Sequence, residues 1–265
     1  MGRCFSMLAA LMCALGISAA DAARADDLAA IKAAKKIRVA IDLGLPPYGM
    51  PDDKMLPTGS DVEAARLLAA DLGVDIEIVP SVAANRVPFL LTNKVDVILS
   101  SLSVTEERRK VIEFSKPYGT IQIGIAAPKS TKIEKLEDLA GKPVGVSRGT
   151  GADQDATKIS KTIAGMTVVR FEDDATVITA VASGQQDIVC TAPAQLTEIN
   201  KRSPGRLLEM KIIVRQNGYA VGLRKDQPEL KAWLDAWVTT NLANNKLREI
   251  YQRYHGIPLP ADMPQ

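Results

Sequence analysis

Apolar positions along the chain follow two repeating patterns, one typical of buried strands and one typical of amphipathic helices. Residues 37–42, 74–79 and 95–101 form short apolar runs rich in β-branched side chains, which favours strands of a parallel sheet. Residues 60–73 place apolar side chains on one helical face and end in glycine. This order of strand, helix and strand predicts an α/β unit with helices on both faces of a sheet.

A second series of the same kind follows further along the chain. Apolar runs at 143–147, 166–171 and 187–191 predict strands, and residues 153–164 and 174–184 between them predict helices. The extended segments 121–126 and 219–224 would connect the two series, and a helical stretch covers residues 227–254.

This organisation predicts a fold of the α/β class with two lobes. Lobe 1 comprises residues 34–121 and 222–260, and lobe 2 comprises residues 124–221. Two extended crossings would form a hinge and leave a ligand cleft between the lobes.

The first residues have the pattern of a signal peptide rather than of a folded element. Arg3 precedes an apolar run at 7–20, which is short for a membrane span, and Ala23-Arg24-Ala25 matches a cleavage site. We expect cleavage after Ala25 and a periplasmic mature protein. A lipid anchor at Cys13 is the alternative, although the residues before this cysteine match an acylation site poorly.

Composition excludes several classes of partner and cofactor. The formal net charge is +2, and no dense run of Lys and Arg indicates nucleic-acid binding. Cys190 is the single cysteine after the signal, so no internal disulfide is expected, and it is interpreted as a small buried hydrophobe. His255 stands alone near the end of the chain, so we expect neither a metal site nor another cofactor.

A cluster of hydroxyl groups follows the predicted strand 95–101. Ser101, Ser103 and Thr105 are followed by Arg108 and Arg109. Ligands of open α/β sheets bind beyond the carboxyl ends of strands, which suggests that part of this cluster faces the cleft. Thr105 is predicted to cap a short helix, and Arg109 is one residue out of phase and should be solvated. A helix cap with a surface salt bridge is the structural alternative for the cluster.

The order and spacing of longer motifs indicate a family. The segments IRVAIDLGLPPY, GSDVEAARLLAADLGVDIEIV, LSSLSVTEERRKVIEFSKPY and LEDLAGKPVGVSRGTG together resemble the periplasmic polar-amino-acid-binding proteins of ABC importers, solute-binding protein family 3. The most specific part is the SxTxxR…FSxPY block. The resemblance implies the type II periplasmic-binding-protein fold and capture of a small carboxylate-bearing polar solute, an amino acid or a derivative. It also implies a monomer that delivers this solute to a membrane permease.

The resemblance also implies the ligand-binding residues. Arg108 would hold the ligand α-carboxylate, since a planar guanidinium donates two parallel bonds to a carboxylate. Ser103 would supply a hydroxyl and a backbone group, and the main-chain carbonyl of Ser101 would face an ammonium. Arg86 matches an arginine that reaches the side-chain carboxylate in aspartate- and glutamate-binding members.

A glycine turn of lobe 2 would complete the carboxylate site. Gly149-Thr150-Gly151 corresponds to the family loop whose backbone N–H groups face the ligand. Glycine allows the close approach, and the loop opens a helix whose N-terminus favours an anion.

Two positions depart from the family pattern. Family members carry an ammonium-binding aspartate five residues after the position of Asp187, and here that residue is Ala192. Leu45 stands where many members have a ligand-covering aromatic residue. Either Asp42, Thr191 or water holds the ammonium, or the ligand is not a standard α-amino acid.

The remaining aromatic residues have structural interpretations. Trp233 and Trp237 lie four positions apart on a predicted helix and are expected in the core. Tyr48, behind two prolines, either lines the cleft or packs under the loop, and the packing interpretation is favoured.

An enzyme on the same fold is the rival class, such as a periplasmic lyase similar to cyclohexadienyl dehydratase. It needs an acid or a base in the cleft, and the sequence offers no convincing pair once Ala192 replaces a carboxylate. We therefore expect a binding protein rather than an enzyme. The sensor domain of a receptor kinase is disfavoured because no kinase region is present.

Overall fold

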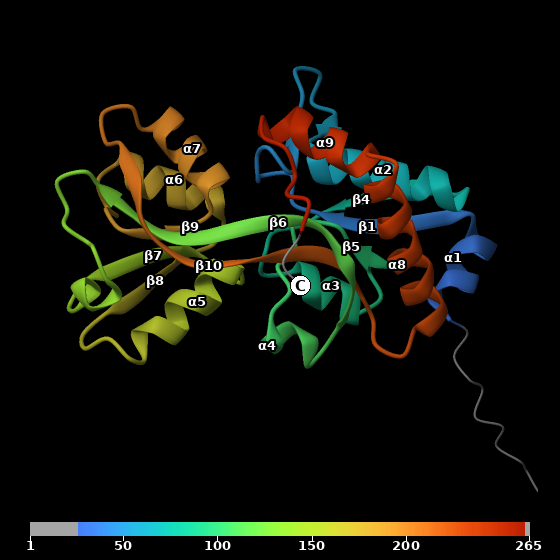
Figure 1. Cartoon of the computed structure of the whole chain (residues 1–265), viewed down its shortest axis with the longest axis horizontal. Coiled ribbons are helices and arrows are strands. Elements are labelled where there is room, and N and C mark those ends of the chain that lie inside the picture. The colour runs from blue at the N-terminus through green and yellow to red at the C-terminus, as the bar shows by residue number, and fades with distance from the viewer. Residues whose placement is uncertain (1–25, 263–265) are drawn as a thin grey trace, which may run out of the picture.

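A computed structural model describes residues 26–262 of the chain. It has two α/β lobes joined by two long neighbouring strands, β6 (Glu113–Pro128) and β10 (Leu208–Leu223), which run through both lobes (Figure 1). The predicted two-lobed α/β fold is confirmed. The predicted signal peptide at residues 1–25 lies outside the described residues.

Lobe 1 contains parallel strands covered by helices. Its strands are β1 (Lys36–Ile41), β4 (Asp75–Pro80) and β5 (Val97–Ile98), with a small hairpin of β2 (Met50–Pro51) and β3 (Pro57–Thr58). Its helices are α1 (Asp27–Ala34), α2 (Ser60–Leu72), α3 (Arg86–Leu91), α4 (Glu106–Arg109), α8 (Pro228–Ala243) and α9 (Lys246–His255).

Lobe 2 repeats this construction with its own strands and helices. Its strands are β7 (Pro143–Ser147), β8 (Thr167–Phe171) and β9 (Val189–Thr191). Its helices are α5 (Gly151–Ser160), α6 (Asp174–Ala182) and α7 (Pro193–Arg202), with a 3-10 turn, η1 (Leu136–Leu139).

One continuous sheet runs through both lobes. Its strand order is β4-β1-β5-β10-β6-β9-β7-β8, so the paired crossing strands lie at its centre. Strands β6 and β10 are antiparallel, and the pairs Thr120–Gly218 and Ile121–Asn217 lie midway along the ladder. Because these two strands continue from one lobe into the other, a change in their twist would change the angle between the lobes.

Each lobe has its own hydrophobic core. In lobe 1 the faces of β1 and α2 pack against Trp237 of α8, and Trp233 packs partly buried beside them, as expected. Lobe 2 has two clusters, one beneath α5 and one between α6 and α7. Ala220 and Val221, which the sequence boundaries assign to lobe 2, pack among lobe 1 residues.

Two elements differ from the sequence prediction. Strand β5 is limited to Val97–Ile98, and Ser101 beyond it adopts a left-handed backbone with φ 42°. The predicted helix 227–254 is divided into α8 and α9 at Asn245, whose φ is 68°. Asparagine enters this region more readily than most residues, so the local sequence favours the break.

Within residues 26–262, no helix has the length and apolar character needed to cross a membrane.

Candidate functional site

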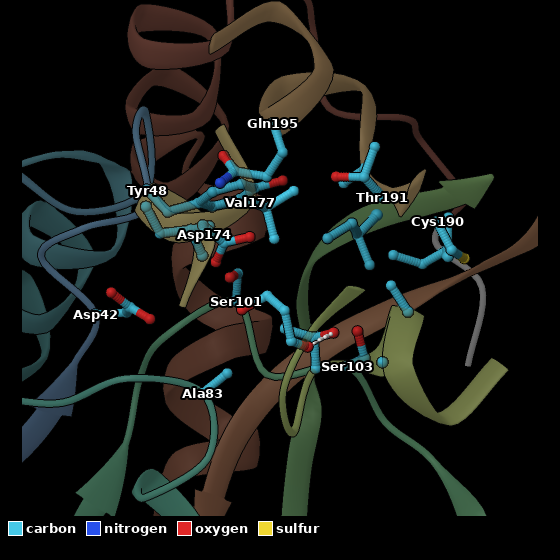
Figure 2. A pocket seen from close by; sticks show the side chains of 18 of the residues that line it. Asp42, Tyr48, Ala83, Ser101, Ser103, Asp174, Val177, Cys190, Thr191 and Gln195 are labelled. Carbon is cyan, nitrogen blue, oxygen red and sulfur yellow. Dashed lines mark hydrogen bonds between the residues drawn. The ribbon is translucent and has the colours of Figure 1, made fainter. Parts of the chain in front are cut away.

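The lobes enclose a cavity at their junction. It has a volume of about 50 Å³, which exceeds the space needed by one water molecule. Figure 2 shows its polar side chains converging from both lobes. The residues predicted from sequence that line it are Asp42, Arg86, Ser101, Ser103, Thr150 and Gly151, together with Leu45, Tyr48, Thr191 and Ala192.

The cavity forms where strands end. Asp42 follows β1, Ser101 follows β5, and Ala192 follows β9, while Ser147 is the last residue of β7. Strands β1 and β5 run antiparallel to β7 and β9, so the carboxyl ends of the strands of the two lobes face each other at the junction. Open α/β sheets bind ligands beyond the carboxyl ends of their strands. Ser101 and Ser103 line this cavity, as their position after the predicted strand 95–101 suggested.

Ser103 connects the cavity to the hinge. It forms an isolated bridge with Tyr219 of β10, and the amide of the next residue, Val104, donates to the Gly218 carbonyl at 3.2 Å. The Asn217 amide donates to the Val104 carbonyl at 2.9 Å. A ligand that contacts Ser103 therefore contacts a segment bonded directly to the crossing strand.

Arg108 is buried beside the cavity and connects the two lobes. Among the described residues, Arg108 is not one of those that line the cavity. Nη1 donates to the Ser103 carbonyl at 2.7 Å, and Nη2 donates to the Gly149 carbonyl of lobe 2 at 2.9 Å. The role of Arg108 in carboxylate binding stays a prediction.

The predicted helix cap at Thr105 and the predicted solvent exposure of Arg109 are confirmed. Thr105 caps α4, and its hydroxyl oxygen accepts from the Arg108 amide at 3.3 Å. Arg108 is 5% exposed, whereas the neighbouring Arg109 is exposed and pairs with Glu106.

Positive charge gathers around Arg108. Burial lowers the pKa of Arg108 well below its ordinary value, and the nearby charges of Arg86 and Arg215 lower it further. Arg215 of β10 is held by Asp155, whose carboxylate accepts from Nε at 2.7 Å, while both Nη atoms are buried without a hydrogen-bond partner among the described residues. A bound anion would relieve this repulsion.

The glycine turn of lobe 2 packs directly against lobe 1. A Cβ on Gly149 would lie 2.7 Å from Ala84 Cα, and a Cβ on Gly151 would lie 3.1 Å from Ser103 Oγ. The Gly149 amide donates to Asp153 at 3.0 Å, and Thr150 caps α5. The contact with the Ala84 backbone therefore requires glycine at position 149, and the Gly149 N–H is already used within lobe 2.

Arg86 is held by lobe 1 at the cavity wall. Nη1 donates to both the carbonyl and the hydroxyl of Ser100, and its Nε is buried without a partner among the described residues. Burial lowers the pKa of Arg86, and the carboxyl groups of Asp42, Asp61 and Asp174 oppose this effect. Arg86 therefore balances several acidic groups, and its contact with a ligand carboxylate stays a prediction.

Two polar residues of lobe 2 that the sequence analysis did not single out line the cavity. Asp174 is the first residue of α6, and Gln195 lies in the first turn of α7. The signal for Asp174 was present, because it lies three residues after the end of strand β8 and begins an apolar helix. Gln195 offered no such signal, since only the packing of α7 against the cavity places it there.

The lobe 2 wall of the cavity contains buried polar atoms without hydrogen-bond partners among the described residues. The Ser147 hydroxyl and both amide atoms of Gln195 are buried and make no hydrogen bond of normal geometry among the described residues. Buried polar groups of folded proteins are nearly always bonded. These groups are available to bond a polar ligand in the cavity.

Apolar side chains cover the rest of the cavity. Tyr48 lines it and also packs edge-on against Tyr219, with ring centroids 5.9 Å apart, and against His255 at 4.7 Å. His255 stacks on Tyr251 and bonds to the Ser60 hydroxyl. Cys190 is buried at the wall, as expected. Within residues 26–262, His, Cys, Asp and Glu form no cluster of three or more that could hold a metal ion.

A two-lobed α/β fold with a small polar cavity at the junction of its lobes defines a solute-binding protein. The family model of bacterial extracellular solute-binding proteins, family 3, matches residues 37–257, and the chain belongs to this family. The resemblance found in the sequence is confirmed.

Relatives of the chain are named as binding proteins. It is 27% identical over 232 residues to the L-arginine-binding protein of Pseudomonas aeruginosa, covering 83% of this chain and 88% of that one. A mutant of an arginine-binding protein from T. maritima has a similar structure, with a TM-score of 0.79, 27% identity and coverage of 87% of this chain and 100% of that one. An ancestral amino-acid-binding protein described as a precursor of cyclohexadienyl dehydratase has a TM-score of 0.76 and 28% identity, covering 86% and 98%.

Proposed function

We propose that this protein binds an α-amino acid in the cavity between its lobes and delivers it to an ABC importer. The observation that carries the proposal is the cavity itself. Arginines lie near one group of its lining residues, and carboxylates lie near another group. Named relatives that bind arginine and cystine support this class of ligand. We further propose that the protein works as a periplasmic monomer after removal of residues 1–25.

Arg108 would attract the ligand carboxylate. Its neighbours Arg86 and Arg215 add positive charge, and the N-terminus of α5 contributes a further positive potential at Gly151. Ser103 and Thr150 would add hydroxyl contacts from opposite lobes. A carboxylate here would accept charge-assisted hydrogen bonds, which are stronger than neutral ones.

Ligand binding would favour the closed lobes. The ligand contacts residues of both lobes only when they are close together, so it binds the closed form more tightly and shifts the population towards it. The hydrogen bond between Arg108 and Gly149 forms under the same condition. The closed form would be the one that the permease recognises.

An enzyme remains the second candidate because one cavity carboxyl titrates near neutral pH. Burial, together with the charge of Asp42, raises the pKa of Asp174 to about 7. A carboxyl with such a pKa suits general acid–base catalysis. Turnover of prephenate or L-arogenate by the purified protein, lost in D174N, would establish a lyase. Absence of turnover together with tight reversible binding supports the transport role.

A ligand panel tests the proposed function. Purified mature protein would be melted with single amino acids, opines and plain organic acids, because a ligand that binds only the folded state raises the melting temperature. We expect the largest shifts from amino acids. If every amino acid leaves the melting temperature unchanged while an organic acid raises it, the proposed ligand class is wrong.

A further inference from the structure

We propose that Asp174 and the amide of Gln195 bind the ammonium group of the ligand from lobe 2, opposite Asp42 of lobe 1. They would replace the carboxylate that is absent at Ala192. This inference rests on the proposed function, since it specifies how the same cavity recognises an amino acid. Figure 2 shows Asp174 and Gln195 close to each other at one wall of the cavity.

The helix start leaves Asp174 available for a ligand. The preceding residue, Asp173, is the N-cap of α6, and its carboxylate accepts from the Thr176 amide at 2.8 Å. The N-terminus of α6 is therefore capped without Asp174. Asp174 lines the cavity, whereas Asp173 is outside its lining.

Gln195 provides an independent indication of a ligand. The residue is 5% exposed and lines the cavity, its amide lies against the Asp174 carboxyl, and its amide oxygen has no hydrogen-bond partner among the described residues. A ligand ammonium has three donors and no acceptor. It could donate to the Gln195 amide oxygen and to the Asp174 carboxylate from the same position.

The charges around Asp174 favour a cation. Burial raises the pKa of Asp174 to about 7, the Asp42 and Asp173 carboxylates raise it, and the Gln195 amide and Arg86 oppose them. Burial likewise raises the pKa of Asp42, with Arg86 opposing. Two carboxyls near one another disfavour each other's ionisation, and a cation between them would remove that repulsion.

The ligand chemistry follows from the two groups of charges. Arg108 and Arg215 adjoin Ser103 and Gly151, whereas Asp174 adjoins Asp42 and Arg86. A molecule with a carboxylate and an ammonium matches both groups. The same molecule without its ammonium matches only the first.

The experiment compares amino acids with their desamino analogues. The probes are L-alanine with propionate, L-glutamate with glutarate, and L-arginine with 5-guanidinopentanoate. Calorimetry would measure each affinity for the wild-type protein, D174N and the control D173N, which removes a neighbouring carboxylate but retains a capping side chain. Circular dichroism and melting curves would establish that each variant is folded.

We expect wild-type protein to prefer the amino acid of the best-binding pair by at least about tenfold, a difference of about 1.4 kcal/mol. D174N should lose most of this preference while its affinity for the desamino analogue changes less than about twofold. D173N should retain the preference. Q195L should reduce it without removing it, since the charge of Asp174 remains.

The double variant D174N/A192D provides a second test. It restores a carboxylate at the family position and should recover the preference for the amino acid. The inference is overturned if D174N keeps the wild-type preference, or if it weakens both members of a pair equally. Wild-type binding of an analogue as tight as its amino acid would overturn the ammonium site but leave the solute-binding function intact. Failure of every probe to bind would overturn both.

Discussion

Arg108 of lobe 1 donates a hydrogen bond from Nη2 to the Gly149 carbonyl of lobe 2, at 2.9 Å. The same guanidinium donates from Nη1 to the Ser103 carbonyl within lobe 1 at 2.7 Å. One side chain therefore connects the hydroxyl cluster, the glycine turn and the interface between the lobes. We therefore expect closure and anion recognition to depend on the same residue.

Replacing Arg108 by lysine tests this connection. R108K keeps the charge, but an ammonium lacks the planar fork that reaches two carbonyls at once. We expect the affinity for the best amino acid of the panel to fall by at least about tenfold, since a charged hydrogen bond contributes about 1.5–3 kcal/mol. Calorimetry measures the affinity, and small-angle scattering measures closure. R109K, a change at the exposed neighbour, serves as the control, and equal affinities of the two variants would refute the prediction.

Alanine at Gly149 should prevent closure. Its Cβ would lie 2.7 Å from Ala84 Cα in lobe 1, and the residue has a φ of 75°. Gly141 is the matched control, because its φ is 70° but a Cβ there meets no atom within 4 Å. Both variants should lose about 1–2 kcal/mol of stability from the left-handed backbone. G149A alone should weaken ligand binding and remain open in scattering measurements. If G149A closes around ligand as G141A does, contact between the lobes does not require this glycine.

Asp61 should make the protein less stable as pH rises from about 4 to about 7. Burial raises the pKa of Asp61 to about 7, with Tyr118 and Arg86 opposing this effect. An unfolded aspartate titrates near pH 3.9, so across this window the folded state holds the extra proton and the free energy of unfolding falls as pH rises.

The variant D61N isolates this contribution. His255 acts in the opposite direction, because burial lowers its pKa to about 4 and its stabilising effect is lost as pH falls from 6.5 towards that value. The difference in free energy of unfolding between D61N and wild type should therefore be measured at pH 5 and pH 8. The stability of D61N relative to wild type should be higher at pH 8 than at pH 5 by about 1–3 kcal/mol. A difference that does not change with pH would contradict the raised pKa.

Aspartate at position 192 should stabilise the protein and tighten amino-acid binding. Ala192 is the N-cap of α7 and makes no side-chain cap bond. An aspartate there can accept from the first turn, which contributes about 1 kcal/mol. Its carboxylate would also lie at the cavity wall, where Ala192 is a lining residue. Melting temperature and calorimetry check the two effects separately. A192S is the control, since it caps the helix without adding charge and should raise stability only.

Much of the fold could be predicted from local patterns. The apolar periods identified the strands and helices of both lobes, because each element buries one face against its neighbours. The phase of α4 followed from Thr105 as its cap, which places Arg108 inside and Arg109 outside. The motif order indicated the family, and strand ends indicated the cavity.

Other features depended on contacts between distant parts of the chain. Asp96, which directly precedes strand β5, binds Arg38 of β1 across 58 positions of sequence. The partner of Arg108 is the Gly149 carbonyl, which lies 41 positions away in sequence and in the other lobe. These outcomes depend on packing geometry, which no local pattern encodes.

The sequence by itself determined the two α/β lobes, the family and a polar site beyond the strand ends that includes Ser103. Only the tertiary structure decided which acidic group faces the cavity in place of the one missing at Ala192. Asp174 is distant from Ala192 in sequence, and it reaches the same wall because β8 and β9 both pair with β7 and end at one edge of the sheet. Sequence spacing records the loss of a charge at one position, but its replacement from another element appears only in space.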